Sequence, residues 1–392
     1  MNAESLRGGE KLRIGVVTTP IGNEMGEIFV ANFVKILEPL SEEIFLITEN
    51  FSGKSTSKIH IIQKAKIEKP FIIHSFPVRL VKFFLTQLSQ CVNLIKVSSR
   101  ISIVAFYLGG SLQVLPALCA KLLGNKTILF YFGSRRTHKI KYAGKLFGLG
   151  GTIFSGIIRI LETITILLSD KVAVESESVI EFAGIGRYRN KIFTGGARYI
   201  DTHLFTIKRN LENRRTLIGY IGNLRPEKGV YNFAKAIPIV IKEHSNVEFL
   251  IGGNGPLLDK ITEELRSSNT GDRVELTRYI PHQEVPRYLN ELKLLVLPSH
   301  TEGVPGIVQE AMACGTPVLA TPVGGVPDLI KDGKTGFILE SNSPESIAKG
   351  ILRALAYPRL DEIAMNAHNF IEREYAYEVM VEKRRSAFAE LG

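Results

Sequence analysis

Short apolar segments alternate with longer amphipathic segments along almost the whole chain. The apolar segments are rich in Val, Ile, Leu and Phe, and their length is typical of buried β-strands. Strands are predicted at Leu12–Thr18, Glu43–Thr48, Ile101–Leu108, Thr127–Phe132, Lys171–Glu175, Lys191–Thr194, Leu217–Ile221, Glu248–Gly252, Arg273–Thr277, Leu294–Leu297, Pro317–Ala320 and Thr335–Leu339. Such regular alternation is typical of parallel βαβ units.

The segments between these strands predict helices, among them Val230–Glu243 and Pro344–Ala356. Ser343 is expected to cap the second of these, with Pro344 at the first helical position, where its missing N–H costs no hydrogen bond. The polar segment Thr206–Thr216 is interpreted as the linker between two α/β units. Open parallel sheets bind ligands at the carboxyl ends of their strands, so two facing units would form a ligand-binding cleft.

The segment from Ser299 to Leu339 carries the clearest chemical signal. Pro305 is suited to the first position of a helix. The next three N–H groups would then lack helical partners and, with the helix dipole, would form an anion site. They belong to Gly306, Ile307 and Val308. Gly306 has no Cβ, so a ligand can approach this backbone closely.

Two glutamates flank this anion site. Glu302 lies on the preceding loop, and Glu310 lies one turn into the helix. Carboxylates accept hydrogen bonds from sugar hydroxyls, so the segment suits a diphosphate with a sugar at either end, which is a nucleotide sugar. The alternative is an ordinary helix with two surface glutamates, but it leaves the ordered run of Pro, Gly and acidic residues unexplained.

The same segment resembles the donor site of retaining GT-B glycosyltransferases of family 4. The resemblance rests on the E-x7-E spacing from Glu302 to Glu310, on EAMACGTPVLA, and on the GGVPDLI turn at Gly324–Ile330. It implies a GT-B fold, an α/β architecture of two Rossmann-like α/β/α domains facing across a cleft. It also implies an acceptor domain at residues 1–205, a donor domain at 206–370, and a final helix in 371–392 that packs back on the first domain.

Other segments extend the resemblance. In Tyr220–Val230, Lys228 stands where the family holds a donor phosphate with lysine, and Asn223 stands where the family commonly has its arginine. Either Arg225 or another base, for which Arg198 is a candidate, would supply that guanidinium. A solvated strand-end loop is the alternative for this segment.

The resemblance also implies that main-chain atoms near Tyr279 and Ile280 border the nucleotide base. It further implies that Gly22 lies in a turn that faces the donor. A plain strand-to-helix turn is the alternative for Gly22. Many relatives carry a His after the fourth strand, whereas this chain has Ser134 and Arg135 there, and these or backbone carbonyls are expected to position the acceptor.

Metal and cofactor chemistry is not expected. His282 and His300 are interpreted as satisfied surface or loop residues, and no paired-aspartate motif is present. We therefore predict no catalytic metal and no cofactor, with the nucleoside diphosphate sugar as donor substrate. The three cysteines show no Cys-x-x-Cys spacing, which fits a reducing cytosol. The residues before the first strand contain no apolar run of signal-peptide length, so no secretory leader is expected.

Charge divides the 392 residues into two unlike halves. The net charge is +10, and residues 1–200 hold 26 Lys+Arg against 14 Asp+Glu. The excess positive charge therefore lies in the first half, where it favours an anionic partner without choosing between membrane, nucleic acid and phosphorylated substrate.

A basic segment beside an apolar segment favours the membrane. Arg135, Arg136 and Lys139 begin a basic run that leads into Leu146–Ile158, which is too short to span a bilayer but can lie at the headgroup interface. Pro77–Val97 mixes apolar and basic residues in the same way. A core helix flanked by a solvated loop is the alternative. We expect an anionic membrane surface or a lipid-linked acceptor as partner, no nucleic acid, and a peripheral cytoplasmic location.

The function predicted from these features is transfer of a hexose, with retained anomeric configuration, from a nucleotide sugar to that acceptor. Eight helical residues advance about 12 Å, far more than the roughly 5 Å between the two carboxyls of a retaining glycosidase. Glu302 is therefore expected to support the transferring sugar and Glu310 to hold the ribose. The alternatives are a GT-B-fold sugar phosphorylase, a nucleotide-sugar epimerase, and a non-catalytic nucleotide-sugar-binding protein.

Overall fold

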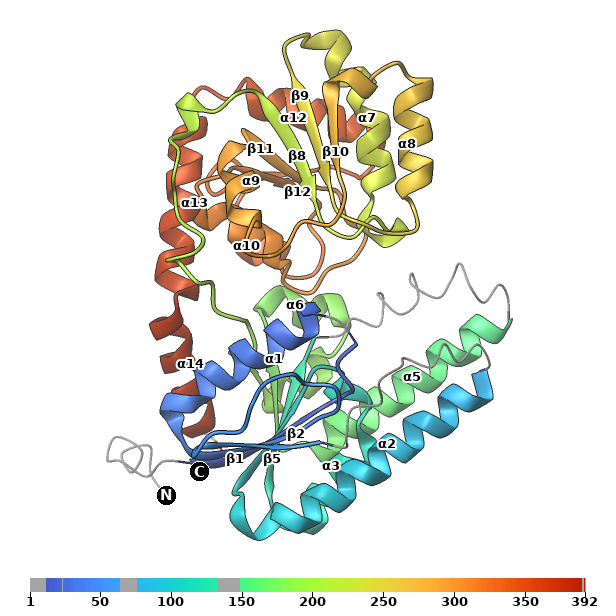
Figure 1. Cartoon of the computed structure of the whole chain (residues 1–392), viewed down its shortest axis with the longest axis vertical. Coiled ribbons are helices and arrows are strands. Elements are labelled where there is room, and N and C mark those ends of the chain that lie inside the picture. Colours follow the sequence, from blue (N-terminus) through green and yellow to red (C-terminus); the bar gives the residue numbers. More distant parts are fainter. Residues whose placement is uncertain (1–11, 23, 64–75, 133–148, 390, 392) are drawn as a thin grey trace.

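The protein folds into two α/β domains, each built on a parallel sheet (Figure 1). The structure is a computed structural model that describes residues 12–22, 24–63, 76–132, 149–389 and 391. The first sheet has seven strands in the order β3-β2-β1-β4-β5-β6-β7, and the second has six in the order β10-β9-β8-β11-β12-β13. This arrangement confirms the predicted α/β class.

The elements of the first sheet and its helices occupy the first half of the chain. They are β1 (Leu12–Thr18), α1 (Glu24–Leu37), β2 (Ser41–Ile47), β3 (Ile59–Ile62), α2 (Phe76–Val97), β4 (Ile103–Tyr107), α3 (Val114–Leu122), β5 (Lys126–Tyr131), α5 (Leu149–Leu168), β6 (Lys171–Val174), α6 (Glu177–Ala183) and β7 (Ile192–Thr194).

The elements of the second sheet and the closing helices follow. They are β8 (Leu217–Ile221), α7 (Val230–Glu243), β9 (Glu248–Gly252), α8 (Leu258–Ser267), β10 (Val274–Thr277), α9 (Val285–Glu291), β11 (Leu294–Leu297), α10 (Gly306–Ala313), β12 (Val318–Ala320), α11 (Val326–Leu329), β13 (Phe337–Ile338), α12 (Pro344–Leu355), α13 (Leu360–Tyr375) and α14 (Tyr377–Ala389).

The apolar pattern predicted all but one of these strands, some to the residue, as at β1 and β8. The strand it missed is β3, a partly exposed edge strand that pairs only with β2. An edge strand buries less of each side chain, so its sequence need not form a long apolar run. The predicted cap of α12 is confirmed, because Ser343 accepts a hydrogen bond from the Ser346 N–H.

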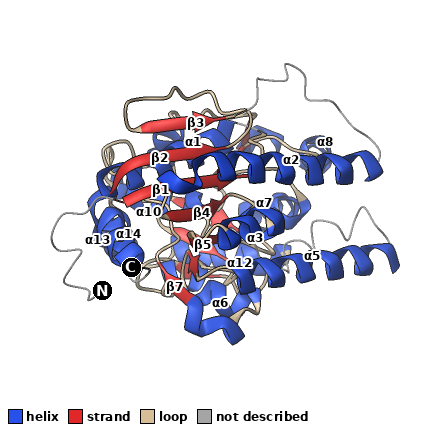
Figure 2. Ribbon diagram, turned by 90° about the horizontal axis from the view of Figure 1, so that it is seen from below, coloured by secondary structure: helices blue, strands red, loops and turns tan. Residues whose placement is uncertain are grey.

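Alternating residues of the first sheet face two different helical layers. Val16 packs in a core with Phe33 of α1, whereas its neighbour Val17 packs in a separate core with Leu94 of α2 and Ile166 of α5. This is the two-residue period of a strand covered on both faces. Consequently α1 and α14 cover one face of the sheet, and α2, α3 and α5 cover the other (Figure 2).

The last helix, α14, lies on the first domain and packs against α1 (Figure 1). The Tyr377 hydroxyl donates to the carbonyl oxygen of Lys35 at 3.0 Å, and the buried Arg384 donates to the carbonyl oxygen of Ala197 at 2.9 Å. The Arg384 guanidinium also lies 4.7 Å from the ring centroid of Phe130. The exact domain boundaries, after residues 205 and 370, stay predictions.

The segment predicted as a linker is anchored to the second domain. Arg214 is only 5% exposed, and its guanidinium donates to the carbonyl oxygens of Leu292 and Cys314 and to the Thr316 hydroxyl. These bonds fix the chain just before β8, so the polar composition of residues 206–216 reflects buried hydrogen bonding as well as solvation.

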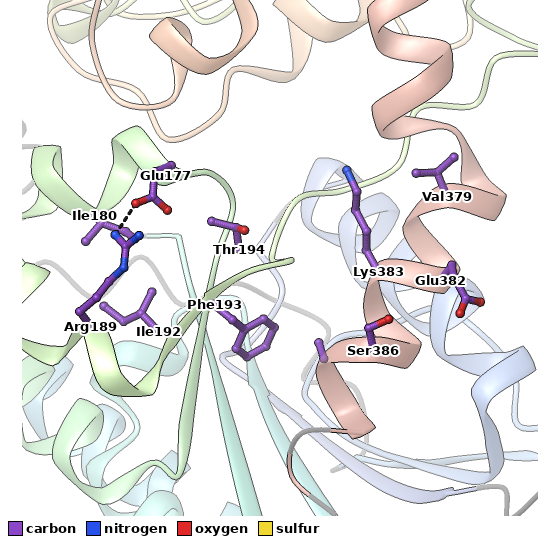
Figure 3. A pocket seen from close by; sticks show the side chains of 11 residues that line it. Glu177, Ile180, Arg189, Ile192, Phe193, Thr194, Val379, Glu382, Lys383 and Ser386 are labelled. Atoms are coloured by element: carbon purple, nitrogen blue, oxygen red, sulfur yellow. Dashed lines mark ion pairs between the residues drawn. The ribbon is translucent and has the colours of Figure 1, made fainter. Parts of the chain in front are cut away.

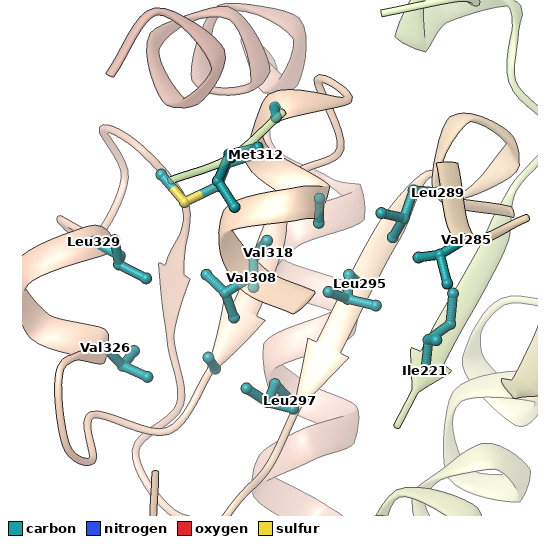
Figure 4. Close-up of a cluster of buried hydrophobic side chains, with 14 of the residues drawn as sticks. Ile221, Val285, Leu289, Leu295, Leu297, Val308, Met312, Val318, Val326 and Leu329 are labelled. Atoms are coloured by element: carbon teal, nitrogen blue, oxygen red, sulfur yellow. The ribbon is translucent and has the colours of Figure 1, made fainter. Parts of the chain in front are cut away.

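The core of the second domain positions α10, the helix of the predicted anion site. Val308 and Met312 project from α10 into a buried cluster with Leu295 of β11 and Val318 of β12 (Figure 4). The start of α10 is therefore held at the carboxyl end of the sheet. Among the described residues, no helix is long and apolar enough to cross a membrane.

Candidate active site in the interdomain cleft

A cleft of about 300 Å³ opens at the carboxyl ends of the second sheet's strands. Residues 220–223 at the end of β8 and 252–254 at the end of β9 form one wall, and the start of α10 forms another. Met25 and Phe29 of α1 close the cleft from the first domain. This is the position at which open parallel sheets bind ligands.

Lys228 and Glu302 meet in this cleft as an ion pair. The Lys228 ammonium nitrogen lies 2.7 Å and 2.8 Å from the two carboxylate oxygens of Glu302. The Ser299 hydroxyl donates to the same carboxylate at 2.7 Å. Glu302 is largely buried and Lys228 is partly exposed to the cleft, so the ammonium can turn toward a ligand.

The glycine turn that follows holds the Glu302 loop in place. Gly324 has φ +58°, and a Cβ there would lie 2.2 Å from the carbonyl oxygen of Glu302. The next N–H, that of Gly325, donates to the carbonyl oxygen of Gly303 at 2.7 Å. Only glycine allows this close approach of two backbone segments, so part of the GGVPDLI motif serves to position Glu302.

Arg198 and Glu310 form the second ion pair of the cleft. The Arg198 guanidinium lies 2.9 Å from a Glu310 carboxylate oxygen, and the His282 ring nitrogen lies 3.1 Å from the same oxygen. Arg198 also covers Gly306, where a Cβ would lie 1.3 Å from a guanidinium nitrogen. The guanidinium is therefore held at the start of α10, next to the predicted anion site.

The start of α10 differs in one respect from the sequence prediction. Pro305 is the N-cap, with extended backbone angles, and the first helical residue is Gly306. The Val308 N–H is nevertheless not free, because it donates to the carbonyl oxygen of Pro305, three residues earlier, at 3.1 Å. Val308 is fully buried and does not line the cleft, so the anion site narrows to the N–H groups of Gly306 and Ile307.

The structure separates the two candidate arginines. Arg198 lines the cleft, whereas Arg225 is exposed and does not line it. Gly22 is likewise exposed and outside the cleft lining, although the helix that begins just after it supplies Met25. The contacts of Arg225 and Gly22 with the donor therefore stay predictions, whereas Arg198 already lies in the cleft.

Tyr279 and Ile280 both line the cleft, as expected of residues at the nucleotide base. Ile280 is buried, while Tyr279 is exposed and its hydroxyl donates to Glu24 of the first domain at 2.6 Å. His282, interpreted from sequence as a surface or loop residue, lies inside the cleft.

The acceptor and membrane candidates Ser134, Arg135, Arg136 and Lys139 lie outside the described residues. Within the described ranges, no three side chains of His, Cys, Asp and Glu come close enough to hold a metal ion.

Sequence reasoning missed a second set of contacts between the domains. Glu175, just after β6, accepts a hydrogen bond from the Val304 N–H at 3.0 Å. Asp328 of the GGVPDLI motif accepts hydrogen bonds from the N–H and hydroxyl of Ser178, both at 2.7 Å. Burial raises the pKa of Glu175 to about 7. Its place at the carboxyl end of a strand was the only signal in the sequence.

A larger hollow of about 700 Å³ lies elsewhere, between β7, α6 and α14 (Figure 3). Its charged side chains have partners, because Arg189 pairs with Glu177, and Lys383 pairs with Glu374 at 3.0 Å. The hollow therefore offers no uncompensated charge to a ligand, and the interdomain cleft remains the candidate active site.

Comparison with known proteins finds sequence similarity in the second half of the chain, which contains most of the cleft residues. Residues 204–374 match the family described as glycosyl transferases group 1. An alpha-D-kanosaminyltransferase of Streptomyces kanamyceticus is 28% identical over 179 residues, which cover 45% of this chain and 46% of that protein. A GDP-mannose-dependent alpha-(1-6)-phosphatidylinositol monomannoside mannosyltransferase of Mycolicibacterium smegmatis is 30% identical over 37% of this chain and 40% of its own length. The match thus spans about half, or less, of these relatives.

Solved structures resemble the whole chain. Sucrose-phosphate synthase of Thermosynechococcus elongatus superposes with a TM-score of 0.74 at 16% identity, over 97% of this chain and 99% of its own. HepE of Anabaena in complex with UDP and glucose gives a TM-score of 0.71 at 12% identity, over 96% and 99%. The fold is therefore GT-B, as predicted, and within it residues 204–374 are similar to glycosyl transferases group 1.

Proposed function

We propose that this protein is a retaining hexosyltransferase of family 4 that uses a nucleoside diphosphate sugar and a membrane-borne or lipid-linked acceptor. The observation that carries the proposal is the pairing of two cations with two carboxylates in one cleft. Lys228 pairs with Glu302 and Arg198 pairs with Glu310, beside the start of α10. Group 1 similarity over residues 204–374 and the UDP complexes of the structural neighbour HepE support this choice of ligand.

A nucleotide sugar can replace the partner of each charged group in both ion pairs. The diphosphate would take the Lys228 ammonium and the Arg198 guanidinium, since charge-assisted bonds to phosphate resemble those to carboxylate. The freed carboxylates of Glu302 and Glu310 would then accept hydrogen bonds from the transferring sugar and from the ribose. The N–H groups of Gly306 and Ile307 would add donors to the phosphate. Each charge present before binding thus keeps a partner after it.

The same groups would lower the barrier to transfer. Negative charge grows on the diphosphate as its bond to the sugar breaks, and fixed donors stabilise that charge most in the transition state. Glu302 would stabilise the positive charge developing on the sugar. As the family resemblance implies, the departing phosphate would take the acceptor's proton, so that the acceptor attacks from the face the phosphate leaves and the configuration is retained. No metal is required in this scheme.

Closure of the two domains would exclude water from the donor. The bonds from Val304 to Glu175 and from Ser178 to Asp328 already join the domains beside the cleft. These contacts would favour the closed state, in which Met25 and Phe29 face the donor-binding residues.

Support for a membrane-borne acceptor comes from the excess of Lys and Arg in residues 1–200. One relative, the mycobacterial mannosyltransferase, is named for a phosphatidylinositol acceptor. We accordingly place the protein at the cytoplasmic face of a membrane. The relatives carry different sugars and nucleotides in their names, so the donor is proposed only as a nucleoside diphosphate hexose.

The test is acceptor-dependent release of nucleoside diphosphate. The protein is incubated with UDP-, GDP- and ADP-hexoses, with and without a membrane lipid extract, and free diphosphate and glycolipid are measured together. A transferase releases diphosphate in step with glycolipid formation, and the product keeps the anomeric configuration of the donor. Phosphate-dependent release of hexose phosphate would indicate a phosphorylase. Altered sugar with no release would indicate an epimerase, and binding without turnover a non-catalytic protein.

A further inference from the structure

Helix α2 presents a line of apolar side chains to solvent. Six exposed side chains follow one another at steps of three and four residues, which places them along one line of the helix. They are Val78, Val81, Leu85, Leu88, Val92 and Ile95. The opposite side buries Gln87 and Gln90, whose side chains bond to the N–H of Leu115 and the carbonyl oxygen of Thr18. The same buried side carries Leu94 and Val97 of the core, so α2 has an exposed apolar line in addition to the buried apolar side of an ordinary surface helix.

Helix α5 repeats the pattern. Its exposed line consists of Ile157, Ile160, Ile164 and Leu167, whereas Glu162 and Thr165 on the opposite side are fully buried. Two long helices of the same domain therefore each expose an apolar line. Their opposite sides are buried and include Leu94 and Ile166 of the core, so rotation of either helix would expose core residues in exchange for hiding its apolar line.

These lines belong to one surface. Helix α3 lies between α2 and α5 and packs against both (Figure 2). Of the 18 large hydrophobic side chains that are exposed among the described residues, 14 lie on these helices or directly after α3. We call this surface the docking face. It comprises Val78, Val81, Phe84, Leu85, Leu88, Val92, Ile95, Leu118, Leu122, Leu123, Ile157, Ile160, Ile164 and Leu167.

The docking face is large and stands out from the fold. Helices α2 and α5 have 22 and 20 residues, which corresponds to roughly 30 Å each. Both project beyond the sheet on the side away from α13 and α14 (Figure 1). Contiguous apolar surfaces of this size mark interaction sites rather than ordinary solvent-facing surface.

The charges around the docking face have one sign. Its helices expose Lys82, Lys96, Lys121 and Arg159, and their only acidic residue, Glu162, is buried. A second copy of the chain would bring these cations against their own equivalents. A surface that is apolar beneath and anionic at its edge complements them instead, and an anionic lipid bilayer has this composition.

We propose that the docking face binds an anionic membrane surface, with the apolar lines of α2 and α5 among the lipid headgroups and the cations against lipid phosphates. The inference deepens the proposed function, on which it rests only for the membrane-borne acceptor. It also assigns the contact to named side chains that sequence reasoning did not single out. Within the predicted segment Leu146–Ile158, it places Ile157 on the docking face.

The experiment measures partition onto vesicles of phosphatidylcholine with and without phosphatidylglycerol. The full chain should bind the anionic vesicles, and added salt should weaken binding without abolishing it. Leu88→Glu and Ile160→Glu should each lower the partition coefficient by about tenfold or more. Lys82→Glu and Lys96→Glu should each lower it by about fivefold at low salt. All four positions are exposed, so the variants should remain folded.

Matched controls are available in the rest of the chain. Met365 on α13 and Ile239 on α7 are exposed apolar residues outside the docking face, and Met365→Glu and Ile239→Glu should bind vesicles like the wild type. Equal losses in these controls would overturn the proposal, as would absence of vesicle binding at low salt. A dimer in sedimentation velocity that Leu88→Glu dissociates, without vesicle binding by the wild type, would assign the surface to a second copy and refute the membrane.

Nucleoside diphosphate binding separates this inference from the proposed function. Leu88→Glu should bind the diphosphate like the wild type, because α2 does not line the cleft. If vesicles bind but no nucleotide does, the proposed function fails and the docking face stands. If nucleotides bind but vesicles do not, the docking face is wrong and the transferase proposal is left with a water-soluble acceptor.

Discussion

Replacing Arg198 tests which arginine holds the donor diphosphate. Arg198→Met keeps a long apolar stem but removes the guanidinium that bonds to Glu310 and covers Gly306. The matched variant is Arg225→Met, which removes a guanidinium that is exposed and outside the cleft lining. The family resemblance left the choice open between Arg225 and another base such as Arg198, so the two variants decide between the candidates.

A hydrogen bond to a charged group contributes about 1.5–3 kcal/mol. Loss of one such bond to phosphate should therefore weaken diphosphate binding by about 10- to 150-fold. Arg198→Met should also lower the melting temperature, since Glu310 is nearly buried and would keep only His282 as partner. Arg225→Met should change the dissociation constant by less than about twofold, because exposed charges at a distance are screened.

The assay compares the dissociation constants of a nucleoside diphosphate and of its nucleoside. Calorimetry measures binding of the diphosphate, and ligand-observed NMR measures binding of the nucleoside. UDP, GDP and ADP are screened first, and the tightest binder is used. The loss in Arg198→Met should appear for the diphosphate alone, because removing the guanidinium frees Glu310 for the ribose. A larger loss in Arg225→Met would refute the reasoning, and so would an equal loss for nucleoside and diphosphate.

Three further predictions concern the other groups of the cleft. Lys228→Ala should lose most diphosphate affinity and turnover, and unchanged affinity in calorimetry would remove Lys228 from the phosphate site. Glu302→Gln should reduce turnover while diphosphate still binds, whereas Glu310→Ala should weaken the nucleotide itself; the same affinity defect in both would contradict separate roles. Folding raises the pKa of Glu175 from 4.5 to about 7, so its stabilising contribution is complete below pH 4.5 and lost as the pH rises through 7. Glu175→Gln should thus have the same melting temperature as the wild type near pH 5 and a higher one near pH 8. A difference in melting temperature that stays constant across this range would exclude the buried carboxyl as the cause.

Local chemistry predicted the parts of the site that lie within one continuous segment. Glu302 and Glu310 could be placed because a loop and a helix start follow from local turn and capping chemistry. Family resemblance named Lys228, and Arg198 as a candidate, but the two ion pairs could not be predicted, because both cations reach the carboxylates from distant segments. Asn223 signalled that the usual arginine was absent, but only the packing of the segment after β7 against α10 brings Arg198 into the cleft, where we propose that it takes that role.

The docking face shows a different limit of sequence reasoning. Apolar residues at steps of three and four define one side of α2, but the same spacing fits a helix that faces a core and a helix that faces outward. Contacts with residues far away in the sequence decide which way each side of α2 faces. One of them is the hydrogen bond from the Gln90 side-chain amide to the carbonyl oxygen of Thr18 at the end of β1. The buried side also carries Leu94 and Val97, which pack in the core with Val17, so turning the exposed line inward would lose both this packing and the bond of Gln90. The exposed line therefore stays outside in the isolated chain, and its burial requires another surface.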